Sequence, residues 1–204
     1  MADVTMHIET ERKFLVLNDS FKQSAVKALR IKQGYIAHDG GNTVRIRICD
    51  NKGILTIKGP SHDGMSRSEW EKEIPLQDAE DLLTLCHAGL IDKTRYIVPA
   101  QDHPSVILSP DHPSVILSPD HPSVILSPDH PSVILSPDPK GRTEESLFFE
   151  VDEFYADNQG LIMAEIELPN PDYPFPKPEW LGQEVTGDKR YYNSYLTRIP
   201  YTKW

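Results

Sequence analysis

The sequence predicts a β-rich α+β fold, in which antiparallel strands close into a barrel with a polar lumen and helices pack on the outside. Most regular segments alternate charged side chains with apolar or small ones, which is the pattern of β-strands. Few segments have helical spacing. An open antiparallel sheet with one charged face in water would show the same alternation, so the signs of the charges have to decide between the two architectures.

The expected elements are short strands joined by turns, with an occasional helix. Strands are expected at 8–14, 32–36, 43–48, 54–58, 67–71, 91–98, 147–154 and 161–168. Turns rich in Gly, Asp and Asn separate some of them, as at 39–42 and 50–53. Helices are expected from the N-capping residues 18–20 to Ile31, over 75–90 and over 188–199.

The strand at 8–14 has the most informative alternation, because Glu9, Glu11 and Lys13 recur at every second position. A strand sends alternate side chains to opposite faces, so these charges would lie side by side. On one strand alone, exposure to water would explain the pattern. The alternation recurs along the chain, however, and adds these residues to one charged face: Arg45, Arg47, Lys58, Arg67, Glu69, Lys93, Arg95, Glu150, Asp152, Glu165 and Glu167.

The charges are divided by strand, and this division favours a lumen over a solvated face. Cationic pairs occupy some strands, as at 45–47 and 93–95, whereas a carboxylate pair occupies 165–167. Arginine and lysine bind phosphate oxygens, and clustered carboxylates hold Mg²⁺ or Mn²⁺. The sequence therefore predicts a site for a polyanion together with a divalent metal ion.

Composition excludes several classes of function. The chain has 204 residues, 38% hydrophobic and 25% charged, which suits one domain with a proper core. Its net charge of −10 argues against a general nucleic-acid binder, so any anion site must be local. There are two cysteines, no leader segment, and no apolar run of the roughly 18 residues that a membrane helix needs. We therefore expect a cytoplasmic protein with no membrane span.

One stretch departs from this pattern. The unit Asp-His-Pro-Ser-Val-Ile-Leu-Ser-Pro occurs four times in succession from Asp102 to Pro137 without substitution, which indicates a very recent duplication or an engineered repeat. Each unit is expected to form a short strand, and the units to stack as a meander. The repeat would sit in a hairpin connection, where insertions are best tolerated. Copying alone accounts for its regularly spaced histidines, so a metal array is the less favoured interpretation.

The segment IETERKF resembles the ExExK signature of the CYTH superfamily, the triphosphate tunnel metalloenzymes. The resemblance continues through KQGY, VRIRI, TIKG, RSEWE, KTRY, FEVDEF, AEIEL and GQEVTGDKRYYN, so it covers essentially the whole chain except the repeat. The tail resembles the short, single-domain bacterial members. ExExK alone is a weak motif, whereas the charged strands in this order are specific.

This resemblance implies a single domain over 1–204, an eight-stranded antiparallel tunnel that acts on a triphosphate with Mg²⁺ or Mn²⁺. Our first hypothesis is hydrolysis of inorganic triphosphate to pyrophosphate and phosphate. Thiamine triphosphatase, class four adenylyl cyclase and nucleoside triphosphatase are alternatives in the same tunnel. A non-catalytic polyphosphate binder, or a scaffold displaying the repeat, is an alternative of a different class. We expect a monomer or a homodimer.

The resemblance also implies roles for individual residues. Metal ligands would be Glu9, Glu11 and Glu167, helped by Glu165 and Asp152, with Glu150 as a further candidate. The phosphate clamp would be Lys13, Arg45, Arg47, Lys58, Lys93 and Arg95, with Arg67 and Arg190 as further candidates. Tyr35 would either pair with Lys13 and turn it into a general base, or serve as an aromatic residue at the rim.

Overall fold

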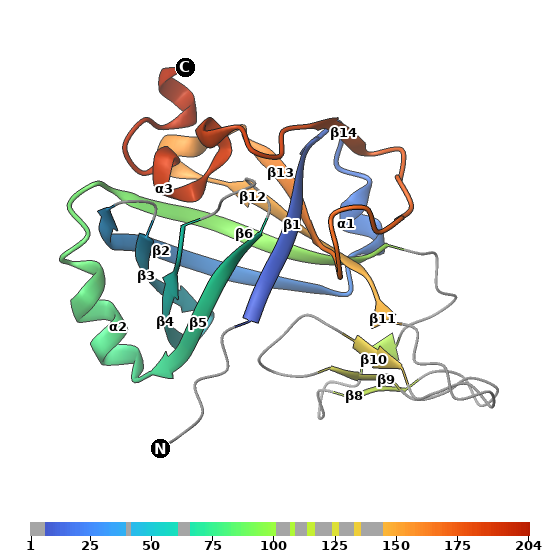
Figure 1. Cartoon of the computed structure of the whole chain (residues 1–204), viewed down its shortest axis with the longest axis horizontal. Coiled ribbons are helices and arrows are strands. Elements are labelled where there is room, and N and C mark those ends of the chain that lie inside the picture. Colours follow the sequence, from blue (N-terminus) through green and yellow to red (C-terminus); the bar gives the residue numbers. More distant parts are fainter. Residues whose placement is uncertain are drawn as a thin grey trace.

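The computed structural model describes most of the chain outside the repeat. The described residues are 7–39, 42–60, 66–100, 107–108, 114–116, 124–126, 133–135 and 145–204. They form two antiparallel sheets, a few short helices, and a long C-terminal segment that crosses one end of the larger sheet (Figure 1). No helix among these residues is long and apolar enough to cross a membrane.

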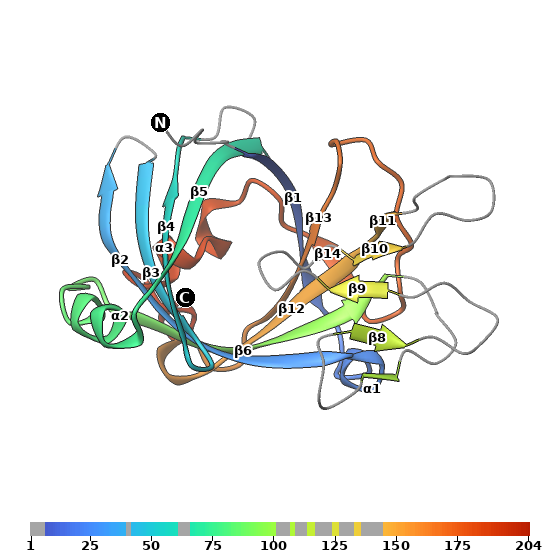
Figure 2. The same cartoon turned by 90° about the horizontal axis from the view of Figure 1, so that it is seen from below.

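The larger sheet has nine strands and curls around a central space (Figure 2). In order across the sheet the strands are β13 (Ile162–Glu167), β12 (Phe148–Phe154), β6 (Leu90–Pro99), β2 (Lys27–Asp39), β3 (Asn42–Cys49), β4 (Lys52–Lys58), β5 (Ser66–Ile74), β1 (His7–Val16) and β14 (Leu181–Glu184). Every pairing in this sheet is antiparallel. The β-rich α+β class predicted from the sequence is confirmed.

The expected closed barrel of eight strands is wrong in strand number and in closure. The short strand β14 adds a ninth member at the second half of β1. β1 also pairs with β13, but over Glu11–Leu15, whereas it pairs with β5 over His7–Thr10. No residue of β1 in this register pairs with both β5 and β13. The sheet is therefore strongly curled without being closed along the full length of its strands.

The helices are shorter than expected. α1 (Phe21–Ser24) ends before Lys27, where β2 begins, so the expected continuation to Ile31 is wrong. In β2, Leu29 and Ile31 alternate with Arg30 and pair with β6, and this sheet pairing outweighs their helical spacing. α2 (Leu76–Leu83) covers half of the expected 75–90 helix. The expected 188–199 helix is broken into η2 (Lys189–Tyr191) and α3 (Asn193–Leu196) by Tyr192, whose backbone is extended.

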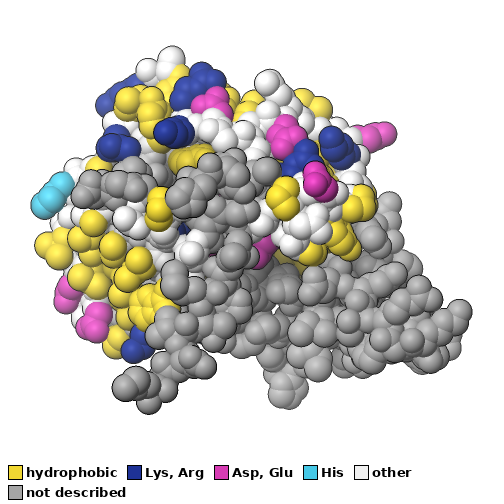
Figure 3. Space-filling model, viewed as in Figure 1, with side chains coloured by type: hydrophobic (Ala, Val, Ile, Leu, Met, Phe, Trp, Pro, Cys, Tyr) yellow, Lys and Arg dark blue, Asp and Glu magenta, His cyan; other side chains and the backbone are white. Residues whose placement is uncertain are grey.

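Apolar clusters cover the outside of the curled sheet. One cluster packs α2 on β3 through Ile46, Ala79 and Leu83. A second packs α1 and the segment around Trp180 on β1 and β12, with Phe21 and Phe149 in its centre. Exposed apolar side chains remain around α2, including those of Leu76 and Leu85, where Figure 3 shows yellow side chains gathered. α1 and α2 thus pack outside, as the sequence predicts, whereas α3 lies at one end of the lumen.

A third cluster closes one end of the lumen. Met163, Ile91 and Phe154 lie two positions from Glu165, Lys93 and Asp152, respectively, so each faces the same side of the sheet as its charged neighbour. The C-terminal segment inserts Leu196 of α3 among them, and that side chain is fully buried. This segment continues into η3 (Tyr201–Lys203), which lies near η1 (Ala156–Asn158). An apolar layer therefore bounds the charged part of the lumen.

The repeat forms short strands of a second sheet. These are β7 (Ile107–Leu108), β8 (Ser114–Ile116), β9 (Val124–Leu126) and β10 (Val133–Leu135), followed by β11 (Glu145–Ser146). Each pairs antiparallel with the next in the chain, so the backbone is a meander, as expected. The strands are shorter than the five-residue Ser-Val-Ile-Leu-Ser segment of each unit.

Gly34, the glycine of the KQGY segment, allows the residues after α2 to approach β2 closely. A Cβ added at Gly34 would lie 2.7 Å from the Cβ of Cys86 and 2.8 Å from a methyl group of Leu90. We expect Gly34→Ala to lower the free energy of unfolding by about 1–3 kcal/mol, because the added methyl group overpacks this contact. Urea unfolding measures the change.

Gly59→Ala is the matched control, since its new Cβ would meet its nearest neighbour at an ordinary 3.6 Å. Its free energy of unfolding should change by no more than about 0.5 kcal/mol. Equal losses at Gly34 and Gly59 would contradict the packing argument.

Candidate active site

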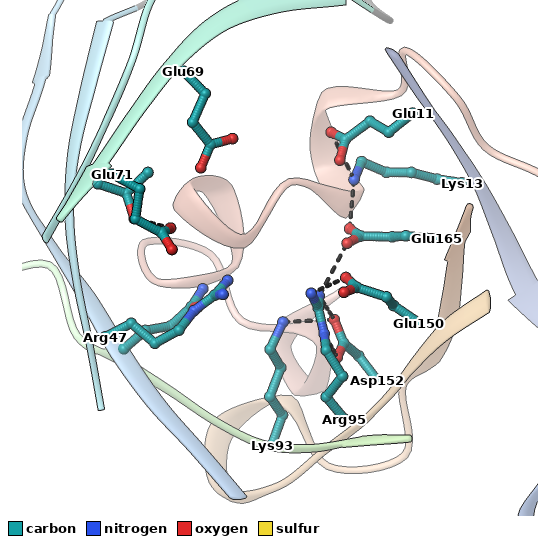
Figure 4. A network of polar contacts seen from close by, with 12 residues as sticks. Glu11, Lys13, Arg47, Glu69, Glu71, Lys93, Arg95, Glu150, Asp152 and Glu165 are labelled. Carbon is teal, nitrogen blue, oxygen red and sulfur yellow. Dashed lines mark hydrogen bonds and ion pairs between the residues drawn. The ribbon is translucent and has the colours of Figure 1, made fainter. Parts of the chain in front are cut away.

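The lumen contains a network of ion pairs on one wall, formed by β1, β13, β12 and β6 (Figure 4). Strand register places Lys13 opposite Glu165, and Glu165 opposite Glu150. Directly opposed residues share a face, so these side chains all point into the lumen. Lys13 Nζ donates to Glu165 and lies 3.0 Å from Glu11 Oε1.

Arg95 is the centre of this network. Its Nε and Nη2 donate to the two oxygens of Asp152 at 2.7 and 2.6 Å, which is bidentate binding of a carboxylate. Nη2 also donates to Glu165 at 3.0 Å, and Nη1 donates to Glu150. Lys93 Nζ donates to Asp152 at 2.5 Å. One guanidinium thus joins three carboxylates from β12 and β13.

Burial and neighbouring charges shift the pKa values in this network. Burial alone would raise the pKa of the Glu165 carboxyl, but Lys13 and Arg95 hold it well below its usual range. Asp152 likewise has a lowered pKa, because Arg95 and Lys93 outweigh its burial. Burial and the adjacent Arg95 lower the pKa of Lys93 to about 7, although Asp152 acts in the opposite direction. Arg95 already compensates Asp152, so Lys93 is a second cation at one carboxylate.

The opposite wall, formed by β3, β4 and β5, holds a second cationic group. Arg45 Nη2 donates to Thr56 Oγ1 at 3.0 Å and lies 3.6 and 3.5 Å from carboxylate oxygens of Glu69 and Glu71. Lys58 Nζ lies 2.5 Å from Glu69. The Nε of Arg45 is buried and has no hydrogen-bond partner among the residues that the structure describes, which is costly for a charged donor. An anion in the lumen would satisfy it.

Arg47 lies beside this group and differs from the other lumen cations. Its Nε donates to Gln33 Oε1 at 3.0 Å. It makes no ion pair with any residue that the structure describes, whereas Lys13, Arg45, Lys58, Lys93 and Arg95 all do. Burial and the nearby Arg45 and Arg95 lower the pKa of Arg47 to about 10, so it remains a cation at neutral pH.

Carboxylates suited to a divalent cation stand next to the ion-pair network. Glu11 and Glu167 are directly opposed on β1 and β13. Two like charges opposed in this way repel each other, and a hard cation with oxygen ligands would relieve that repulsion. The donor chemistry therefore fits Mg²⁺ or Mn²⁺. No group of three or more His, Cys, Asp or Glu side chains in the described part of the chain has the geometry of a metal site.

The remaining predicted ligands are placed as follows. Glu9 of β1 is the register partner of Arg67 of β5, and the side chains of both lie outside the described residues. Asp152 and Glu165, predicted to assist the metal, accept hydrogen bonds from Lys93, Arg95 and Lys13.

The described contacts do not join two further candidates to the ion-pair network around Arg95. Arg190 is a surface residue, with its side chain 59% exposed and 2.6 Å from Asp188. Tyr35 accepts a long hydrogen bond of 3.5 Å from Gln33 Nε2, and the described contacts do not join it to Lys13.

Sequence reasoning missed two polar residues of the lumen. Gln33 and Thr56 are completely buried, and each is the hydrogen-bond partner of an arginine. Gln33 lies two positions from Tyr35, and Thr56 two positions from Lys58. Their positions within the alternation carry the signal, but they lack the charge that marks the other lumen residues.

A lumen with cations on two walls and opposed carboxylates on one of these walls fits a binding protein or enzyme for a compact polyanion. The family comparison agrees: the CYTH domain model matches residues 7–116, more than half of the chain. The protein therefore belongs to the CYTH domain family.

Two curated relatives are named inorganic triphosphatase. The one from Acetivibrio thermocellus is 37% identical over 194 residues, which is 95% of each chain. The one from Nitrosomonas europaea is 27% identical and covers 92% of this chain and 95% of its own. A solved structure of the inorganic triphosphatase NE1496 is similar with a TM-score of 0.53 and 25% identity, covering 93% of this chain and 97% of that one.

Proposed function

We propose that this protein is a metal-dependent triphosphatase that hydrolyses inorganic triphosphate to pyrophosphate and phosphate. One observation supports this most directly: buried cations face one another across the lumen of a protein whose net charge is −10. A small, highly charged anion is the ligand that such a local concentration of positive charge attracts. The names of its two curated relatives agree with this activity.

The cations would bind and orient the phosphoryl groups. Arg45 and Arg47 would do so from one wall, while Lys13, Lys93 and Arg95 would do so from the other. Their fixed positive charges would also stabilise the charge that develops on the phosphoryl oxygens during hydrolysis. Lys58 and Arg67 are proposed to extend this clamp on β4 and β5, and Arg190 from the C-terminal segment.

Glu11 and Glu167 would hold the metal ion, together with Glu9 and with help from Asp152 and Glu165. When bound, Mg²⁺ or Mn²⁺ supplies Lewis-acid polarisation of the phosphoryl group and favours formation of the attacking hydroxide. The carboxylates that now neutralise the clamp would then serve the metal, while the clamp cations bind substrate. Lys13 is the proposed general base, and Tyr35, which the described contacts do not join to Lys13, is proposed as an aromatic residue at the rim.

A phosphate-release assay tests the proposal. We expect turnover of tripolyphosphate with Mg²⁺ or Mn²⁺ and none when the metal is chelated. ATP and thiamine triphosphate are the comparison substrates, because each carries a group that needs a pocket of its own. Faster turnover of either would contradict the assignment to inorganic triphosphate, and no turnover of any of the three would contradict an enzymatic role.

Three further assignments complete the proposal. The repeat at 102–137 is treated as an insertion into the connection between β6 and β12, which is supported by the pairing of Pro99 with Phe148 at the adjoining strand ends. Cys49 and Cys86 are free thiols, in keeping with the cytoplasm. The working unit is a monomer or a homodimer.

A further inference from the structure

The amide side chain of Gln33 lies against Arg47 in the lumen, at the point where Arg47 faces the other wall. The two residues are register partners on β2 and β3, and the Gln33 side chain is fully buried. Arg47 Nε can only donate, so the oxygen of the Gln33 amide faces it, at 3.0 Å. A buried amide in contact with one particular atom of an arginine restricts how that arginine can turn.

Occupation of Nε leaves the two terminal nitrogens of Arg47 for other partners. These two nitrogens form the edge of the guanidinium that binds phosphate in a bidentate manner. Figure 4 shows Arg47 extending from its wall towards the interior of the lumen, opposite the network around Arg95. Gln33 therefore binds the Nε of Arg47 and leaves its two terminal nitrogens to face a substrate in the lumen.

The neutrality of Gln33 matters as much as its position. The other clamp cations with described side chains are each paired with a carboxylate, which a phosphate would have to displace. Arg47 is held by an uncharged group and makes no ion pair in the described part of the chain. Its positive charge is thus already available to a bound anion.

We infer that Gln33 is a positioning residue, which orients Arg47 through its Nε and leaves the charge of Arg47 uncompensated for a substrate phosphoryl group. This inference rests on the proposed triphosphate site. Through Gln33, the inference gives β2 a role in substrate recognition that the charged residues alone do not reveal.

Equilibrium binding of tripolyphosphate without metal, measured by titration calorimetry, tests the inference directly. We expect Gln33→Met, which is close in shape but cannot accept the hydrogen bond, to weaken binding about tenfold, since a hydrogen bond to a charged group is lost. Gln33→Glu should weaken binding at least as much, because its carboxylate would neutralise Arg47. Gln23→Glu, the same charge change on the exposed surface of α1, should change the dissociation constant less than about twofold.

A double-mutant cycle separates positioning from a structural role. With Arg47→Met already present, Gln33→Met should change the dissociation constant less than about twofold, because nothing remains to be oriented. Equal losses in both backgrounds, or unchanged binding in Gln33→Met alone, would overturn the inference. If Gln33→Met does not fold, Gln33→Glu decides: unchanged binding overturns the inference and weakened binding supports it.

The same experiments distinguish this inference from the proposed function. A wild-type protein that binds tripolyphosphate but releases no phosphate would contradict the hydrolytic function, and the binding cycle would still decide the role of Gln33. A wild-type protein that does not bind tripolyphosphate at all would overturn both.

Discussion

Glu167→Gln is expected to reduce the rate of tripolyphosphate hydrolysis by at least about 100-fold, because the metal ion supplies several kcal/mol of transition-state stabilisation. Glu11→Gln should have an effect of the same size, since Glu11 and Glu167 are opposed on β1 and β13. Phosphate release at saturating Mg²⁺ or Mn²⁺ measures the rate.

The stability of Glu167→Gln should not fall with its activity. This variant removes one of two opposed negative charges, so its free energy of unfolding should change by no more than about 1 kcal/mol, whereas Glu11→Gln also loses the ion pair with Lys13 and is not used for this comparison. Glu80→Gln, on the exposed surface of α2, is the matched control and should change neither quantity. In Glu167→Gln, a loss of activity accompanied by a large loss of stability would contradict the assignment of Glu167 as a ligand.

Arg95→Met should lower the free energy of unfolding by about 3–5 kcal/mol, which is the cost of breaking a buried ion pair by removing one partner. Of its partners in the described part of the chain, the fully buried Asp152 would keep Lys93 alone, and Glu150 and Glu165 would each lose a donor. Urea unfolding at neutral pH measures the loss.

Two variants show whether the effect of Arg95 comes from buried charge. Adding Asp152→Asn to Arg95→Met should restore part of the stability, because the uncompensated carboxylate is then gone. Lys52→Met removes an exposed ion pair with Glu73 and should cost no more than about 1 kcal/mol. A loss at Lys52 as large as that at Arg95 would show that burial is not the cause.

The fold was predictable wherever one periodicity dominated. In strands such as β3 and β6, charged side chains alternate with apolar or small ones, and these charged side chains line the lumen. The helix predicted to end at Ile31 was wrong. Leu29 fits both a helical spacing from Ala25 and a strand spacing to Ile31, and only the pairing with β6 decides between the two structures. β14 was missed because four residues that include Gly182 carry little pattern of their own.

The candidate site was predictable in its charged members but not in their partners. That Asp152 would bind Arg95 depends on the register between β12 and β6, which lie 57 residues apart along the chain for this pair. Composition and alternation contain no information about register across that distance. Gln33 was missed for a different reason: its place in the alternation puts it on the lumen face, but only its contact with Arg47 shows what an uncharged residue does there.

The pairing of β1 with β13 determines when this part of the sheet can fold during synthesis. Lys13 and its partner Glu165 lie 152 residues apart along the chain, and the backbone of Lys13 is hydrogen-bonded to Thr186 and Val185 as well. Contacts between such distant residues form slowly, because a long loop must close first. During synthesis the first half of β1 can therefore pair with β5 early, whereas the half that carries Glu11 and Lys13 can pair only after β13 has been made, and the proposed site is complete only then.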